Sequence, residues 1–177
     1  MLFRSPVSPA NAVDTGQLLS ALKQLGPKAH GNARVEVTTN RPGAGAAFQL
    51  GEEIRFLVTS TTSGYLYLFH VDAEKDVTRI FPNEYQREAR IQAGAALEVP
   101  PAGAPFKFEA TPPFGLETTL AFVTESLLDE GGLQEIGIGL RQPGTRGISV
   151  KPVRGSTPAD ASSPEFVWNA VTVLITP

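Results

Sequence analysis

The sequence predicts a mainly β protein, an antiparallel β-sandwich of the immunoglobulin-like or a related type with one or two short helices. Short runs of alternating apolar and polar residues recur from residue 33 onward, turn-forming residues separate nearly all of them, and little helical periodicity lies among them. A chain of 177 residues is long enough for one domain with its own core. We therefore expect a linker or disordered stretch at 1–13 and a single sandwich domain at 14–177.

A short amphipathic helix is expected before the first strand, in "DTGQLLSALKQLG". Asp14 or Thr15 is the start signal, and Gly26 with Pro27 is the stop. The apolar residues between these signals recur at helical spacing: Leu18, Leu19, Leu22 and Leu25. We expect this leucine face to cap an edge or end of the main core, with docking on a partner as the alternative.

The strands begin where the hydrophobic period changes to two. "ARVEVTT" places Val35 and Val37 on one side of a strand, and "EEIRFLVTS" does the same for Ile54, Phe56 and Val58. The segment between them, "NRPGAGAAFQLGE", contains Pro and several Gly residues and is interpreted as a connection. Later segments with the same character are "GYLYLFHV", "DVTRIFP", "ALEVP", "FKFEA" and "ETTLAFVT".

The C-terminal third combines a long loop with a closing strand. Residues 141–165 are mostly Pro, Gly, Ser and charged residues, with one strand-like piece at 147–150, and indicate a long surface loop. "FVWNAVTVLIT" is rich in β-branched residues and lies between Pro164 and Pro177. That composition predicts a buried closing strand.

Composition excludes several classes of function. A formal charge of −3, with scattered Lys and Arg residues, provides no basic field for nucleic acid. The chain has no Cys, and so no disulfide or thiolate nucleophile. No run is long enough for a membrane span, and the opening residues lack the apolar core of a signal peptide. Their linker-like composition suggests the trimmed part of a longer envelope protein.

The best chemical candidate is a weak cluster in "HVDAEKD", composed of His70, Asp72, Glu74 and Asp76. In a strand His70 and Asp72 point the same way, and the three acids have the spacing that opens a calcium loop. Val77 stands where that loop needs Gly, and Asn83 stands where it needs a bidentate Glu. We favour an exposed hairpin turn whose carboxylates are solvated, and predict no metal site and no cofactor.

Nucleophilic catalysis finds little support in the residue types. The chain has only two histidines, His30 and His70, and no Gly-x-Ser-x-Gly elbow. We therefore predict no catalytic residues and no enzymatic activity. Tyr65 and Tyr67 share one strand face with Phe69, while Trp168 stands alone in the last strand. Such a row is more typical of a sandwich core than of a sugar-binding platform.

Four short motifs, in this order, resemble the bacterial domain-of-unknown-function family numbered 4384. They are Leu-Gly-acid at 50–52, Gly-Tyr-Leu-Tyr at 64–67, Phe-Pro-Asn at 81–83 and Pro-Phe-Gly at 113–115. The resemblance covers about residues 33 to 125. It implies an accessory sensing or binding module of envelope proteins, signalling kinases, caspase-like peptidases and secretion-associated lipoproteins. It implies no catalytic residue, and the turn has "EKD" where the family commonly has Asp-Gly.

Both later motifs have a structural interpretation. In Phe-Pro-Asn, Phe81 anchors a strand end, Pro82 stops ladder pairing and Asn83 bonds the turn backbone. In Pro-Phe-Gly, Phe114 is a second anchor, and Gly115 allows a backbone angle or close approach that a side chain would block. The expected structural residues are Tyr65, Tyr67, Phe81, Pro82, Asn83, Pro113, Phe114, Gly115 and Trp168.

These observations favour a non-catalytic accessory module that binds or senses another protein in the periplasm or cell envelope. A cell-wall glycan is the alternative ligand. A metal-dependent hydrolase built on the His70 cluster is less favoured, and a purely structural spacer with no partner of its own is the remaining hypothesis. We expect partner contacts to concentrate on residues 15–25 and on the loop 141–165, since loops on a rigid scaffold carry function.

Overall fold

The predicted mainly β class is confirmed in the part of the chain that the structure describes. The structure, a computed structural model, describes three stretches: residues 33–43, 45–129 and 166–177. Their strands are β1 (Val35–Thr39), β2 (Ala46–Gln49), β3 (Glu53–Ile54), β4 (Phe56–Ser60), β5 (Gly64–Val71), β6 (Val77–Phe81), β7 (Arg90–Ile91), β8 (Ala96–Val99), β9 (Phe108–Glu109), β10 (Gly115–Thr124) and β11 (Phe166–Thr176).

Three predicted segments lie outside the described residues: the linker 1–13, the helix 14–25 and the loop 141–165. The predicted hairpin agrees closely with β5 and β6, and the closing strand agrees with β11. The predicted strand "FKFEA" is shorter than expected, because only Phe108–Glu109 pairs with another strand.

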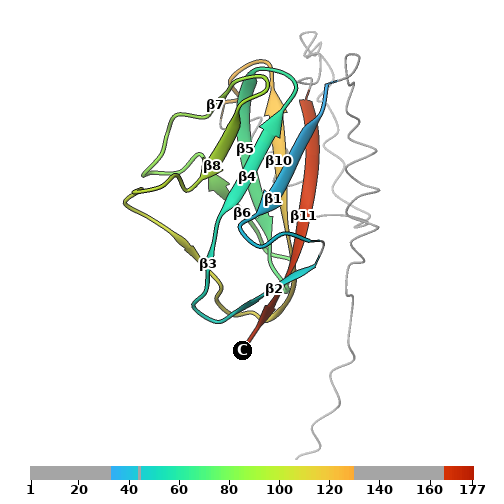
Figure 1. Ribbon diagram of the computed structural model, residues 1–177, viewed down its shortest axis with the longest axis vertical. Coiled ribbons are helices and arrows are strands. Elements are labelled where there is room, and N and C mark those ends of the chain that lie inside the picture. The colour runs from blue at the N-terminus through green and yellow to red at the C-terminus, as the bar shows by residue number, and fades with distance from the viewer. Residues whose placement is uncertain (1–32, 44, 130–165) are drawn as a thin grey trace, which may run out of the picture.

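Two main sheets and a small third sheet make up the fold (Figure 1). The three-stranded sheet has the order β1-β4-β8. The larger sheet has the order β2-β11-β10-β5-β6, with β7 also paired to β5, and β3 pairs with β9 in the third. Figure 1 shows β4 crossing in front of β5 and β10, as expected for the two layers of a sandwich.

The antiparallel prediction needs one correction, in the segment expected to be a simple connection. Residues 46–49 form β2, which runs parallel to the C-terminal half of β11. The pairing buries Phe48 completely. Alternation over four residues is too short to indicate a strand among so many glycines, and the partner lies more than a hundred residues away in the sequence.

The predicted strand at 52–60 divides where the chain passes between sheets. Glu53–Ile54 pairs with β9, whereas Phe56–Ser60 pairs with β1 and β8. At the division, Arg55 N donates to Asn40 Oδ1 at 3.0 Å, and Asn40 N donates to Arg55 O at 2.9 Å. These bonds satisfy the backbone where no strand ladder does.

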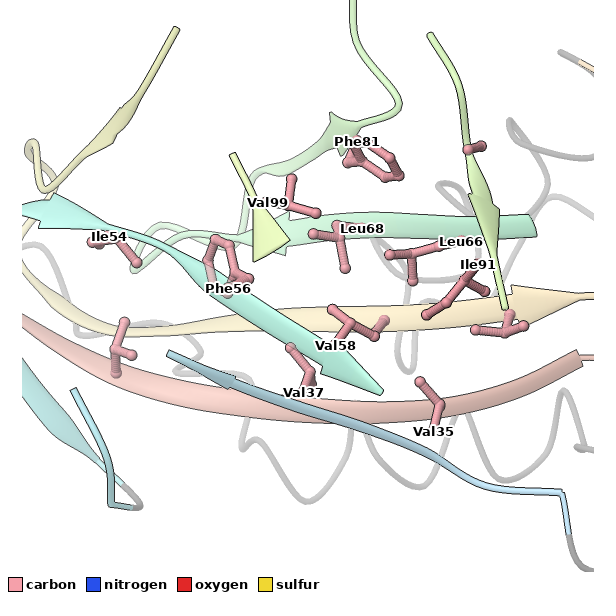
Figure 2. Close-up of a cluster of buried hydrophobic side chains, with 14 of the residues drawn as sticks. Val35, Val37, Ile54, Phe56, Val58, Leu66, Leu68, Phe81, Ile91 and Val99 are labelled. Carbon is pink, nitrogen blue, oxygen red and sulfur yellow. The ribbon is translucent and has the colours of Figure 1, made fainter. Parts of the chain in front are cut away.

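The first core lies between the three-stranded sheet and the inner face of the larger sheet (Figure 2). Figure 2 shows apolar side chains from both layers, including Val37 and Val58 from one and Leu66 and Leu68 from the other. Val58, Leu66 and Leu68 have no solvent exposure. Each such side chain contributes about 1.5–3 kcal/mol of gross stabilisation.

A second apolar cluster occupies the outer face of the larger sheet. Because side chains alternate along a strand, Tyr67 and Phe69 of β5 point away from Leu66 and Leu68. The buried members of this outer-face cluster are Tyr67, Phe69, Val71, Val77, Leu120, Phe122 and Phe166. The aromatic row is therefore buried, as a core would require, but on the outer face and not between the sheets.

Gly64 lets two neighbouring strands come unusually close at the start of β5. A Cβ atom at this position would lie 2.3 Å from the backbone oxygen of Thr124 and 3.1 Å from a methyl carbon of Val123. A backbone oxygen cannot rotate away as a side chain can. The Gly-Tyr-Leu-Tyr motif therefore requires glycine at its first position for a steric reason.

We expect Gly64→Ala to lower the free energy of unfolding by about 3 kcal/mol, because the added methyl group overpacks a backbone contact. Gly103→Ala is the control: a Cβ there meets no atom within 4 Å, but the φ of +77° costs about 1 kcal/mol. Chemical denaturation of both variants measures the difference. A loss at Gly64 no larger than at Gly103 would contradict the steric explanation.

Candidate functional site

A surface groove of about 420 Å³ lies at the loop between β8 and β9. We call it the proline-loop groove; it is lined by Glu53, Arg55, Pro100, Pro101, Ala102, Gly103, Ala104, Pro105, Phe106 and Lys107. Ala104 N donates to Pro101 O at 3.1 Å, and Gly103 takes a φ of +77°. Three prolines and this turn restrict the conformations that the loop can adopt.

An aromatic path connects the first core to the groove. Phe108 lies against buried Phe56, with ring centroids 5.9 Å apart, and Phe106 packs edge-on to Phe108 at 5.6 Å. Tyr85 stacks on Phe106 at 5.6 Å with an angle of 18° between the rings. Although it stacks, Tyr85 is 59% exposed. The path holds an exposed tyrosine in place next to the groove.

The Phe-Pro-Asn motif shapes the loop that carries Tyr85. Phe81 is fully buried, and Asn83 Nδ2 donates to Ile80 O at 3.0 Å. Asn83 Oδ1 accepts from the backbone N–H of Tyr85 at 3.0 Å and of Gln86 at 2.9 Å. The expected roles of Phe81 as anchor and Asn83 as turn-former both agree with these contacts. The Phe-Pro-Asn motif thus fixes the position of Tyr85 through the buried ring of Phe81 and the hydrogen bonds of Asn83.

Paired charges form the rim of the groove. Glu53 faces Glu109 across the β3–β9 pair, an arrangement of like charges that would destabilise the sheet by itself. Arg55 Nε lies 2.6 Å from Glu53 Oε1, and Lys107 Nζ lies 2.5 Å from Glu109 Oε1. Hydrogen bonding to Glu53 raises the pKa of Arg55, and hydrogen bonding to Glu109 raises the pKa of Lys107.

The groove combines an aromatic wall with a charged rim. Among its described lining residues Glu53 is the single carboxylate, and none is His, Cys, Ser or Thr. Acid–base or nucleophilic catalysis requires such groups within hydrogen-bond reach of one another.

The four residues of the weak cluster are divided between a turn and the sheet interior. Asp72 Oδ1 accepts from the backbone N–H groups of Glu74 and Asp76, both at 2.9 Å, and Lys75 takes a φ of +73°. Asp72 therefore holds the hairpin turn, while Glu74 and Asp76 are exposed. Within the described ranges no three His, Cys, Asp or Glu residues gather as a metal site would require.

His70 lies within β5 and not in the exposed hairpin turn that the sequence indicated for its cluster. Its Nε2 lies 3.0 Å from Glu117 Oε2 and its Nδ1 lies 3.0 Å from Thr119 Oγ1, both on β10. The side chain of Glu117 is 7% exposed, and that of His70 is 24% exposed. The antiparallel register brings Thr119 opposite His70, and no sequence signal could have revealed that pairing.

The order Glu117, His70, Thr119 resembles an acid–base–nucleophile arrangement. Thr119 is only 2% exposed, however, so a substrate cannot reach its hydroxyl group. The arrangement is better explained as hydrogen bonding that satisfies a buried carboxylate.

The Pro-Phe-Gly motif requires a correction. Phe114 is 41% exposed and so is no core anchor, contrary to the sequence interpretation. Gly115 has a φ of +142°, and a Cβ there would lie 3.0 Å from that of Ala73, so its expected backbone role is present. Pro113 is half-buried in the extended entry to β10.

The remaining motif residues lie on the outer face. Tyr67 Oη accepts a hydrogen bond from Leu128 N at 2.8 Å, and Arg90 lies over the ring of Tyr65 at 5.3 Å from its centroid. Trp168 is half-buried and stands opposite Phe122 in the β10–β11 register, so it is not isolated as expected.

The comparisons with known proteins confirm the family resemblance. Residues 47–126 match the family described as "Domain of unknown function (DUF4384)". No curated protein matches the chain. Among solved structures, Spo0M, a sporulation control protein from Bacillus subtilis, aligns with 13% sequence identity and a TM-score of 0.36. The alignment covers 82% of this chain and 49% of Spo0M. No helix in the described part of this chain is long and apolar enough to cross a membrane.

The two motif phenylalanines should differ in their contribution to stability. We expect Phe81→Ala to cost about 3–5 kcal/mol, because it leaves a cavity in the first core. Phe114→Ala should cost about 1 kcal/mol or less, because the ring is already largely in solvent. Urea denaturation of the two variants gives both values. Equal losses would show that Phe114 packs as an anchor after all.

The buried Glu117 carboxylate should make His70 important for stability. Replacing His70 by Ala removes the hydrogen bond and leaves the carboxylate unpaired, at a cost of about 1–3 kcal/mol. Glu74→Ala removes an exposed acid from the adjacent turn and should change stability by no more than about 0.5 kcal/mol. Chemical denaturation compares them. No loss in the His70 variant would place Glu117 in contact with solvent.

Proposed function

We propose that the protein is a non-catalytic accessory module that binds a short segment of another protein in the proline-loop groove. The observation that supports this most strongly is the aromatic path that ends at Tyr85 beside the groove. A large exposed ring costs little side-chain entropy to immobilise when its neighbour already holds it. Tyrosines held in this way are frequent hot spots of protein interfaces.

The lining residues limit the chemistry of the bound segment. A volume of about 420 Å³ lies within the usual range for binding pockets and has room for a few side chains. Phe106 favours an apolar or aromatic group at the wall, while Glu53, Arg55 and Lys107 favour charged or polar groups at the rim. We therefore infer an apolar residue flanked by charges, with salt-dependent binding at the rim.

A cell-wall glycan is the alternative ligand, and the same tyrosine favours it. Sugar rings stack on exposed aromatic faces, and Tyr85 is 59% exposed. Against this reading, Tyr85 is the single exposed ring at the groove among the residues that the structure describes, and the rim charges are already paired with neighbouring charges. The peptide ligand is therefore preferred.

The metal-dependent hydrolase has weaker support. Its proposed cluster divides between the Asp72 turn and the His70–Glu117 contact. The periplasmic or envelope setting, and the sensing role, belong to the same proposal as the binding function. They are supported by the family resemblance alone.

A random peptide library displayed on phage tests the binding function. Peptides selected on the wild-type protein should bind Tyr85→Ala at least about tenfold more weakly, a loss of about 1.4 kcal/mol. Leu57→Ala is the control, because Leu57 is also an exposed apolar residue, 44% exposed on β4. It should bind the peptides as the wild type does.

Purified cell-wall glycan strands form the second arm of that experiment. Glycan binding that Tyr85→Ala abolishes, with no peptide selected, would favour the alternative ligand. Peptide binding that is lost in Leu57→Ala and kept in Tyr85→Ala would place the site elsewhere on the sandwich.

A further inference from the structure

Five charged side chains form one alternating row along the rim of the proline-loop groove. Arg55 is shared by two carboxylates: its Nε lies 2.6 Å from Glu53 Oε1, and its Nη1 lies 3.4 Å from Glu98 Oε1. Lys107 is shared in the same way. Hydrogen bonding to Glu109 raises the pKa of Lys107, and the negative charge of Glu53 raises it further. The order along this row, which we call the rim row, is therefore Glu98, Arg55, Glu53, Lys107 and Glu109.

The rim row has more negative than positive charge. Three carboxylates stand against two cations, which leaves a net charge of −1. The three carboxylate side chains are 39–41% exposed, so a ligand in the groove can reach them. Glu53 also faces Glu109 across the β3–β9 pair, where the Cβ atoms of opposite residues lie about 4.5–5.5 Å apart. A cation from a ligand would reduce this repulsion, whereas an anion would increase it.

The open face of Tyr85 favours a cation as well. One face of its ring stacks on Phe106, and the residue remains 59% exposed. The face of an aromatic ring carries partial negative charge, which attracts an ammonium or guanidinium group within about 6 Å. The groove therefore offers a basic side chain both a carboxylate surface and an aromatic surface.

We propose that the segment bound in the proline-loop groove is basic, with Lys or Arg next to its apolar residue. This inference rests on the proposed peptide binding and adds the sign of the charge that the ligand carries. The apolar residue contacts Phe106 at the wall, and the basic side chains face the surplus carboxylate of the rim row. An acidic segment meets repulsion from the same row and is discriminated against.

Three synthetic pentapeptides test the sign of the charge. Each has Phe at its centre, flanked on both sides by Lys, by Gln or by Glu, with Ala and a neutral blocking group at each end. Binding to the complete ¹⁵N-labelled chain is followed through the backbone amide signals of Tyr85, 102–104 and 106–107. At about 10 mM salt we expect the Lys peptide to bind at least about fivefold more tightly than the Glu peptide, with the Gln peptide between them. At about 200 mM salt the difference should narrow, because screening weakens exposed charge pairs.

Two double variants separate the rim row from the charge of the whole protein. Glu98→Gln with Glu109→Gln removes two carboxylates and changes the net charge of the rim row to +1. The Glu peptide should then bind more tightly than the Lys peptide. Glu36→Gln with Glu74→Gln removes the same charge from exposed positions outside the groove lining and should keep the wild-type order.

The results distinguish this inference from the proposed peptide binding. Equal binding of the three peptides to the wild type, or tighter binding of the Glu peptide, would overturn the basic preference and leave the groove as a peptide site. An unchanged order in the Glu98 and Glu109 double variant would also overturn it. If none of the peptides shifts these amide signals at millimolar concentration, the proposed peptide binding is wrong, and the basic preference is wrong with it.

Discussion

The larger sheet buries side chains on both of its faces, and the rest of the architecture depends on this constraint. β5 and β10 lie in its centre, with Leu66 and Leu68 facing the inner core while Tyr67 and Phe69 face outward. A strand that is buried on both faces needs a packing partner on each face. The three-stranded sheet supplies the inner cover.

The same central strands determine where the functional surface can lie. β5 and β10 are buried on both faces over most of their length, and the ligand contacts that we propose fall on the connections between strands. The connection after β6 carries Tyr85, and the connection after β8 carries Phe106. Both loops are held from inside, the first by Phe81 and Asn83 and the second by Phe108 against Phe56. A rigid interior thus presents an ordered surface.

The charged side chains also divide between the buried central strands and the exposed loops. The Glu117 carboxylate on the inner face of β10 is buried and is hydrogen-bonded to His70 Nε2, while His70 Nδ1 is hydrogen-bonded to Thr119 Oγ1. The carboxylates of Glu53 and Glu109 at the groove are matched by exposed cations, where each pair contributes little to stability. The buried polar contact therefore contributes to the fold, whereas the exposed pairs lie at the groove that we propose as the binding site.

The sequence by itself determined the class of fold and the local roles of several motif residues. Period-two alternation is a local signal, so Val35 and Val37, the β5–β6 hairpin and the closing strand could all be predicted from it. The role of Asn83 in the turn after β6 could be predicted for the same reason, because it depends on neighbouring residues. Only the tertiary structure decided which residues meet across strands: β2 against β11, His70 against Glu117, and Tyr85 on Phe106. These contacts depend on strand register and on loop closure between distant segments. Neither leaves a pattern in neighbouring residues. For this reason the sequence predicted a core anchor at Phe114 and did not indicate Tyr85 as a site residue.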